Sequence, residues 1–126
     1  MRSNSRVFAF KVIFAHLFGS DVLETQKMIL DEEKLSEKEL EFANEIVGAF
    51  MENEYHLSKE IDEMLENYHR DRLFKVDLTL LYLALSELKV CKTPKQVVIN
   101  EVLEMAKKFS TEKSQKFING VLAKKE

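Results

Sequence analysis

The sequence predicts an all-α fold, a single-domain bundle of about seven helices over residues 1–126. Three observations support this prediction. The chain has 126 residues, which is enough for one hydrophobic core. It contains only 3 glycines and 1 proline, too few for the many sharp turns of a sheet protein. Its apolar side chains recur at the spacing of a helix face.

The first helix is expected over residues 5–18, and a short helix over residues 22–30 follows it. Four apolar side chains share one face of the first helix: Phe10, Ile13, Phe14 and Leu17. Ser3 or Ser5 can cap its start, and Gly19 can end it in a left-handed conformation.

A longer helical pattern starts at Ser36 and Glu39, which form an S-x-x-E capping box. The apolar spacing continues as far as residue 68. Because a helix of about thirty residues without an internal cap is unusual, we expect two helices with a break near residues 52–54.

Three more helices complete the prediction. Residues 77–89 are apolar on all sides, which indicates a central helix. Thr93 is expected to cap the next helix, with Pro94 at its first position and Phe109 near its end. After a turn over residues 110–113, a last helix is expected to reach residue 122.

The net charge of −3 is unevenly distributed along the chain. Residues 1–20 carry +3, residues 21–104 carry −10 and residues 105–126 carry +4. If the two basic ends meet in the fold, they form a positive surface on an acidic protein. Terminal lysines can also simply be solvated, so the charge alone names no partner.

Few groups in the sequence point to catalysis or to a metal site. The single cysteine, Cys91, excludes an internal disulfide and a two-cysteine metal motif. The histidines are far apart, and the motifs GxxxxGKS/T, GxGxxG and GxSxG are absent. No apolar run approaches the roughly 18 residues that span a bilayer, and no signal peptide is apparent. We expect a cytoplasmic protein without catalytic activity, cofactor or metal.

Four segments, in order along the chain, resemble motifs of the NusB transcription antitermination family. Residues 98–109, VINEVLEMAKKF, resemble the pattern AINEAIELAKxF, and residues 114–122, SQKFINGVL, resemble SxKFVNGVLD. Residues 76–88 are similar to VDRxILRxAxYEL, and residues 5–18 match parts of SRRxAReaalQaLY. The resemblance covers nearly the whole chain and is weakest over residues 20–38.

The resemblance implies a NusB-like helical domain that acts as an adaptor in transcription antitermination. Family members pair with NusE, a small-subunit ribosomal protein, and bind single-stranded boxA RNA in nascent, chiefly ribosomal, transcripts. The resulting complex lets RNA polymerase read through terminators. The family has no catalytic activity or cofactor and includes both monomers and homodimers.

The resemblance also assigns candidate binding residues. The expected RNA-binding residues are Arg2, Arg6, Lys11, Lys113, Lys116, Phe117 and Asn119. The expected NusE-binding residues are Phe18 and Asp77. Phe117 can equally anchor the last helix in the core, and Asp77 can stabilise a helix as a first-turn acid.

The sequence departs from the family pattern where arginines are usual. Val7, Phe8 and Phe10 replace arginines of the first helix, and Tyr82 replaces one in the central helix. Fewer cations mean fewer phosphate contacts, so we expect weak RNA binding by the chain alone or binding that depends on NusE.

Two alternatives remain open at this point. The chain could be a NusB-like protein-interaction module with weak or no RNA binding. It could also be a fragment of an enzyme, since some ribosomal RNA cytosine methyltransferases carry a NusB-like domain before the catalytic domain.

Overall fold

The computed structural model describes residues 2–32, 34–66 and 69–125, and these residues form helices and no strands. The all-α prediction is therefore confirmed. In chain order, the helices are α1 Arg2–Leu17, α2 Val22–Glu32, α3 Glu37–Met64, the short 3-10 helix η1 Arg70–Arg72, α4 Lys75–Val90, α5 Lys95–Phe109 and α6 Glu112–Leu122. Within this described part of the chain, no helix is long and apolar enough to cross a membrane.

The described residues form six α-helices, where the sequence predicted about seven helices. The difference lies at Asn53 in α3, where the backbone leaves the helical region (φ −124°, ψ 16°). The side-chain amide of Asn53 donates a hydrogen bond to the carbonyl oxygen of Ala49 at 2.8 Å. Because such a bond competes with the backbone ladder, the helix bends here instead of stopping. The predicted break is present as a kink.

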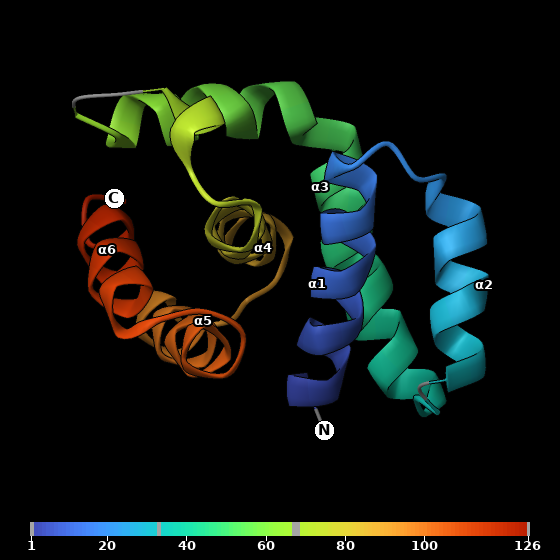
Figure 1. The fold of residues 1–126 in the computed structure, drawn as a ribbon. Coiled ribbons are helices and arrows are strands. Elements are labelled where there is room, and N and C mark those ends of the chain that lie inside the picture. Colours follow the sequence, from blue (N-terminus) through green and yellow to red (C-terminus); the bar gives the residue numbers. More distant parts are fainter. Residues whose placement is uncertain (1, 33, 67–68, 126) are drawn as a thin grey trace.

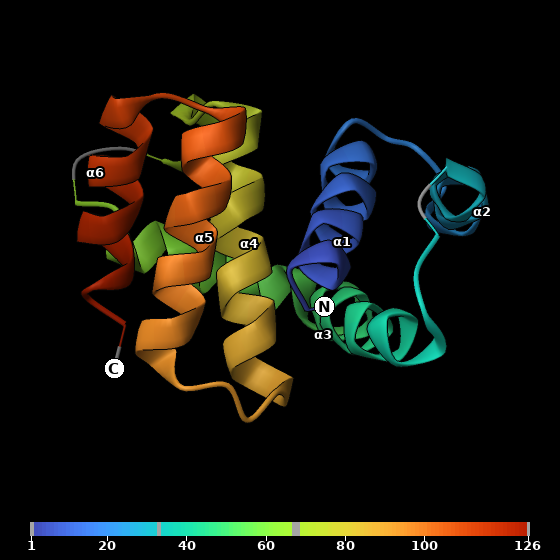
Figure 2. The same cartoon turned by 90° about the horizontal axis from the view of Figure 1, so that it is seen from below.

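Helix α4 is the central helix of the molecule, as predicted. All its residues from Asp77 to Glu87 are buried. Helix α1 and the first half of α3 lie on one side of α4, and α5 and α6 lie on the other (Figures 1 and 2). The second half of α3 crosses α4 and ends near the chain end that follows α6. Helix α2 lies on the outside of α1 and buries only Ile29.

Two predicted helix signals are confirmed. The Ser36 hydroxyl accepts a hydrogen bond from the Glu39 backbone N–H (3.2 Å), and a Glu39 carboxylate oxygen accepts one from the Ser36 backbone N–H (2.9 Å). This is the predicted capping box. Gly19 follows α1 with a φ of +89°, a conformation that favours glycine.

Three predicted caps are wrong. Ser3 and Ser5 lie inside α1, and the buried Ser5 hydroxyl instead donates to the carbonyl oxygen of Glu39 at 2.7 Å. Thr93 does not cap α5, because the helix begins one residue later than expected and Pro94 occupies the N-cap position. The Thr93 hydroxyl is buried without a hydrogen-bond partner in the described structure.

Candidate functional site

Asp77, one of the two predicted partner-binding residues, lies in the first turn of α4 and is only 5% exposed. Its two carboxylate oxygens accept hydrogen bonds from the hydroxyls of Ser110 and Ser114, each at 3.0 Å. The backbone N–H of Ser114 donates in turn to the hydroxyl of Thr111, which caps α6. Asp77 thus joins the start of α4 to the junction of α5 and α6. Its position in the first turn also stabilises the α4 dipole.

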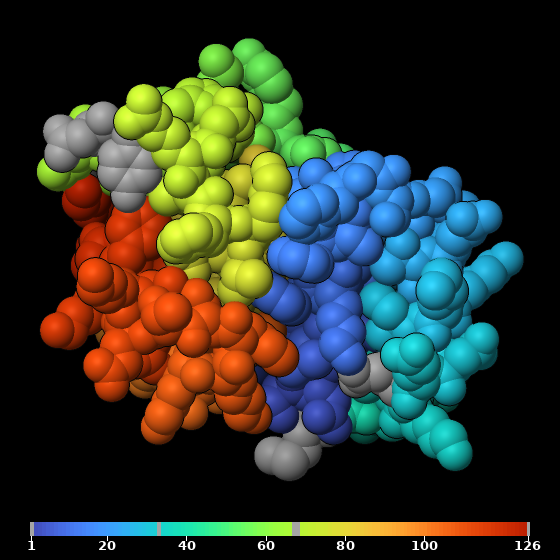
Figure 3. Space-filling model, in the orientation of Figure 1, coloured from blue at the N-terminus to red at the C-terminus, as the bar shows by residue number. Residues whose placement is uncertain are grey.

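A groove of about 640 Å³ opens beside Asp77, between the start of α4 and the first turns of α6. We call it the α4–α6 groove. It combines two aromatic rings, Phe74 and Phe117, with two exposed cations, Arg72 and Lys113. The lining residues are Arg72, Leu73, Phe74, Asp77, Thr111, Lys113, Ser114 and Phe117. The segment leading into α4 reaches the surface between α1 and the α5–α6 turn (Figure 3).

The predicted RNA-binding residues of α6 are largely accessible. Lys113, Lys116 and Asn119 are exposed, whereas Phe117 is half-buried and packs partly against the core. Phe117 also borders a second hollow, of about 300 Å³, along the later turns of α6. Gly120 lines this hollow, and a Cβ atom there would meet nothing within 4 Å. Phe117 therefore borders two hollows, one lined by Lys113 and the other by Lys116 and Lys124.

Arg6, a predicted RNA-binding residue, is only 4% exposed and points into the core. Its guanidinium donates two hydrogen bonds to the carboxylate of Glu87 on α4, both at 2.7 Å. Glu101 on α5 lies 3.8 Å from the same guanidinium. Burial opposes the charge of Arg6, but hydrogen bonding and attraction to Glu87 and Glu101 outweigh it and raise the pKa of Arg6. The RNA-binding role of Arg6 stays a prediction.

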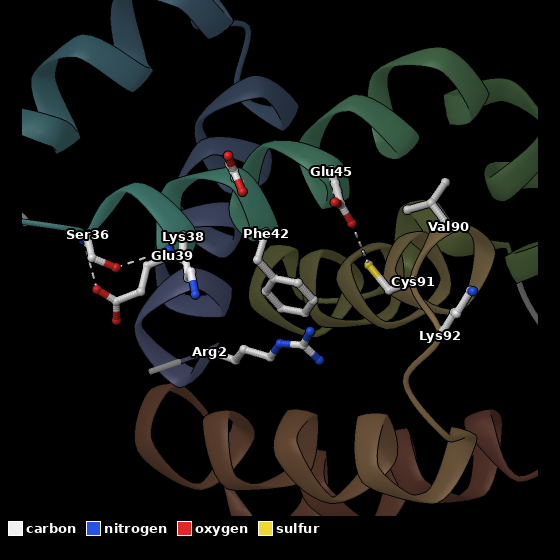
Figure 4. Close-up of a pocket in the computed structure, with 10 residues that line it drawn as sticks. Arg2, Ser36, Lys38, Glu39, Phe42, Glu45, Val90, Cys91 and Lys92 are labelled. Atoms are coloured by element: carbon white, nitrogen blue, oxygen red, sulfur yellow. Dashed lines mark hydrogen bonds between the residues drawn. The ribbon is translucent and has the colours of Figure 1, made fainter.

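The other two predicted cations of α1 lie elsewhere on the helix. Arg2 is exposed, and its guanidinium stacks over the Phe42 ring, 4.3 Å from the centroid. It borders an open cleft of about 790 Å³ between the start of α3 and the end of α4, which Cys91 and Glu45 also line (Figure 4). Lys11 is half-buried near the middle of α1.

Phe18, the second predicted partner-binding residue, follows the last turn of α1 and is 62% exposed. Its ring meets the edge of Phe14, with 4.9 Å between centroids. Phe14 stacks on Phe10 at 5.9 Å, and Phe10 stacks on Phe109 of α5 at 5.2 Å. A row of four rings therefore connects α5 to the exposed end of α1.

The structure brings only some of the predicted residues together. Lys113 and Phe117, predicted to bind RNA, share the α4–α6 groove with Asp77, predicted to bind the partner. Arg2 and Phe18 lie at opposite ends of α1. Helices α4 and α5 lie between α1 and α6 (Figures 1 and 2). The two basic ends nevertheless meet where α1 packs against the end of α5: Phe10 stacks on Phe109, and Arg6 and Lys108 line one small hollow.

Sequence reasoning missed two residues of this region, Phe74 and Glu87. Phe74 is 77% exposed at the start of α4, where a capping residue would be usual. Glu87 is fully buried in the most apolar helix, and a buried carboxylate requires a charged or hydrogen-bonding partner. Glu87 had a signal in the sequence, an acid in an apolar run, whereas Phe74 had none, because the helix was predicted to begin at residue 77.

The described residues contain no group of three or more histidines, cysteines, aspartates or glutamates that could hold a metal ion. The burial of Cys91 and the nearby carboxylates of Glu87 and Glu45 raise the pKa of its thiol to about 12. This thiol is therefore poorly suited to act as a nucleophile.

Comparison with known proteins gives a consistent result. The model of the NusB family matches residues 3–126. The transcription antitermination protein NusB of Sulfurovum sp. (strain NBC37-1) is 32% identical over 122 residues, covering 96% of this chain and 94% of that protein. The NusB protein of Listeria monocytogenes serotype 4b (strain CLIP80459) is 39% identical over 105 residues, covering 80% of this chain and 82% of that protein.

Two solved structures share the fold over almost the whole chain. NusB of T. maritima superposes with a TM-score of 0.90 at 36% identity, covering 98% of this chain and 88% of that chain. A chain from a crystal structure of the antitermination factors NusB and NusE in complex with double-stranded RNA superposes with a TM-score of 0.86. It is 28% identical and covers 97% of this chain and 92% of that chain.

Proposed function

The chain belongs to the NusB family, and from this membership we propose that it is a transcription antitermination factor that pairs with NusE and binds boxA-type RNA. It acts as an adaptor that joins a nascent transcript to the complex on RNA polymerase. The known complex of NusB, NusE and RNA supports both partners. We further propose that residues 1–126 work as one NusB-like domain in the cytoplasm, as a monomer or homodimer, without catalytic activity or cofactor.

The exposed residues of α6 are the main support for the proposed RNA binding. Lys113 and Lys116 are exposed, and each lines one of the two hollows that Phe117 borders. Single-stranded RNA is held by cations along its backbone and by aromatic rings against its bases. Asn119, also exposed on α6, can donate to and accept from base edges.

The cations of α1 have different parts in the proposal. We propose that Arg2 and Lys11 contribute electrostatic attraction from α1, because Arg2 is exposed and Lys11 is half-buried. Arg6 would have to leave Glu87 to reach RNA, and separating a buried ion pair is costly. Its surroundings therefore favour a positioning role, in which it holds α1 against α4 and α5.

The partner side of the proposal uses Phe18 and Asp77. The exposed ring of Phe18 offers apolar contact area of the kind that dominates protein interfaces. Asp77 acts mainly by fixing the position of α4 relative to the α5–α6 junction, since its carboxylate is engaged by two serine hydroxyls. The acidic middle of the chain suits a basic ribosomal protein.

One observation favours a second candidate function, a NusB-like module that binds NusE but not RNA. Residues 1–20 contain three cations, and one of them, Arg6, is buried in the ion pair with Glu87. The N-terminal helix therefore offers fewer phosphate contacts than the family pattern implies.

Fluorescence anisotropy with a labelled boxA oligonucleotide, with and without NusE, distinguishes the two candidates. We expect weak binding by the chain alone and much tighter binding when NusE is present. A scrambled oligonucleotide of equal length is the control. The absence of any RNA response with NusE bound would reject the RNA-binding function and leave the interaction module.

A further inference from the structure

We propose that Phe74 is a second base-stacking residue, and that Phe74 and Phe117 together form the walls of a slot in the α4–α6 groove that takes one unpaired RNA base. This inference rests on the proposed RNA-binding function and adds a residue and a subsite to it.

The first argument comes from the local sequence at the start of α4. Phe74 occupies the N-cap position with extended backbone (φ −60°, ψ 141°), and no side chain caps the helix there. Serine, threonine, aspartate and asparagine are the residues that stabilise this position. Lys75 follows in the first turn, where the helix dipole disfavours a cation. Residues that are unfavourable for the helix start, with no compensating contact nearby, are typical of functional positions.

The second argument comes from exposure and neighbours. Phe74 is 77% exposed, so its ring contributes little to the core, whereas Phe8 and Phe50 are fully buried. A single exposed aromatic needs no explanation by itself. Phe74, however, lines the same groove as Phe117, the aromatic residue of the proposed RNA surface.

The third argument identifies the ligand by its chemistry. The groove volume of about 640 Å³ lies within the roughly 300–1,000 Å³ that is usual for small-ligand sites. Its exposed charged side chains are Arg72 and Lys113, since Asp77 is buried and engaged by serine hydroxyls. Aromatic walls for a base and cations for the adjoining phosphates match single-stranded RNA.

The substitution Phe74→Ser tests this role separately from folding. Serine at the N-cap, three residues before Asp77, restores the usual start of a helix, so we expect the melting temperature to stay the same or rise. The affinity for single-stranded boxA RNA in the presence of NusE should fall by roughly 5- to 150-fold, the range for loss of one base–aromatic stack. The affinity for NusE without RNA should not change.

Tyr55→Ser is the matched control. Tyr55 is 78% exposed on α3 and does not line the groove, so its replacement should leave RNA affinity unchanged. A series of oligonucleotides, each with one abasic position, completes the test. At the position that occupies the slot, the abasic RNA should bind the wild-type chain and Phe74→Ser equally, because the stack is already lost.

Three results would overturn the inference. If Phe74→Ser binds RNA as tightly as the wild-type chain, base stacking at Phe74 is rejected while the proposed function stands. If the variant loses affinity for NusE in the absence of RNA, the groove is a protein contact. If the wild-type chain binds no RNA even with NusE, the RNA-binding function itself fails and the inference fails with it.

Discussion

At the scale of single residues, the ion pair between Arg6 and Glu87 is a buried polar contact between α1 and α4. Both side chains are almost completely buried, and the guanidinium and carboxylate share two hydrogen bonds of 2.7 Å. Such a pair gains attraction at low dielectric but loses the hydration of both charges. Its net contribution to the free energy of unfolding is therefore small, while the loss of one member leaves an unpaired buried charge.

We therefore predict that Arg6→Met and Glu87→Met each lower the free energy of unfolding by about 3–5 kcal/mol. The double variant should recover a large part of this loss, because no buried charge remains unpaired at these two positions. Urea unfolding followed by circular dichroism measures all three. Losses that simply add in the double variant would show that the two residues act independently.

The same scale yields a prediction for Cys91. The pKa of its thiol is about 12, raised by burial and by Glu87 and Glu45, and its sulfur donates to a Glu45 carboxylate oxygen at 3.6 Å. Because only the thiolate reacts, iodoacetamide should alkylate the folded chain at pH 7.5 about 100-fold more slowly than the unfolded chain, after allowing for the greater nucleophilicity of a high-pKa thiolate.

The pH dependence of the alkylation rate shows whether the pKa of the Cys91 thiol is raised or lowered. In the folded chain the rate should keep rising about tenfold per pH unit beyond pH 9, whereas in the unfolded chain it should level off near its ordinary pKa of about 8.5. Glu45→Gln should speed the folded reaction, since it removes a neighbouring negative charge. A folded rate that levels off near pH 8.5 would contradict the raised pKa.

Two residues, Phe10 and Tyr82, show what could and could not be predicted about packing from the sequence. Phe10 and Tyr82 stand where the family usually has arginine, and both are buried. Phe10 stacks on Phe109, and the Tyr82 hydroxyl lies 2.6 Å from that of Ser58. The sequence identified these departures, but their packing depends on contacts between helices far apart in the chain, which periodicity does not reveal.

At the scale of the helices, the capping box at the start of α3 is the best test of local sequence signals. Ser36→Ala should lower the free energy of unfolding by about 1 kcal/mol, because the backbone N–H of Glu39 loses its partner. Thermal unfolding measures this change. Ser3→Ala is the control: Ser3 is exposed within α1, so its replacement should leave the melting temperature nearly unchanged. Equal effects of the two substitutions would show that the box contributes no stability.

Whether a helix start was predicted correctly depends on how many residues of the sequence mark it. Ser36 and Glu39 each accept a hydrogen bond from the other's backbone N–H, so two residues together specify the start of α3. Thr93 and Pro94 were expected to share a boundary, but α5 starts after Pro94, whose fixed φ suits the N-cap equally well. The early start of α1 was missed because Ser5, a usual capping residue, instead bonds to α3.

At the scale of the whole molecule, the two basic ends meet where α1 packs against α5, but their exposed cations are spread over more than one helix. Arg2 lies at the start of α1, whereas Lys113 and Lys116 lie on α6, with α4 and α5 between them (Figure 2). The fold class followed from composition and periodicity. The groove did not, since it arises where the starts of α4 and α6 meet, and no local pattern specifies that junction.

If the proposed RNA path follows α6, its lysines should determine the salt dependence of binding. The slope of log K against log salt for single-stranded nucleic acid changes by about 0.7 for each phosphate neutralised. Lys113→Gln and Lys116→Gln should therefore each flatten the slope by up to about 0.7, and the double variant should show the sum.

Lys27→Gln, an exposed change on the outer helix α2, should leave the slope unaltered. Anisotropy titrations with NusE at several salt concentrations measure these slopes. An equal slope for all four variants would place the RNA path away from α6, and a change with Lys27→Gln alone would move it to the outer face of α2.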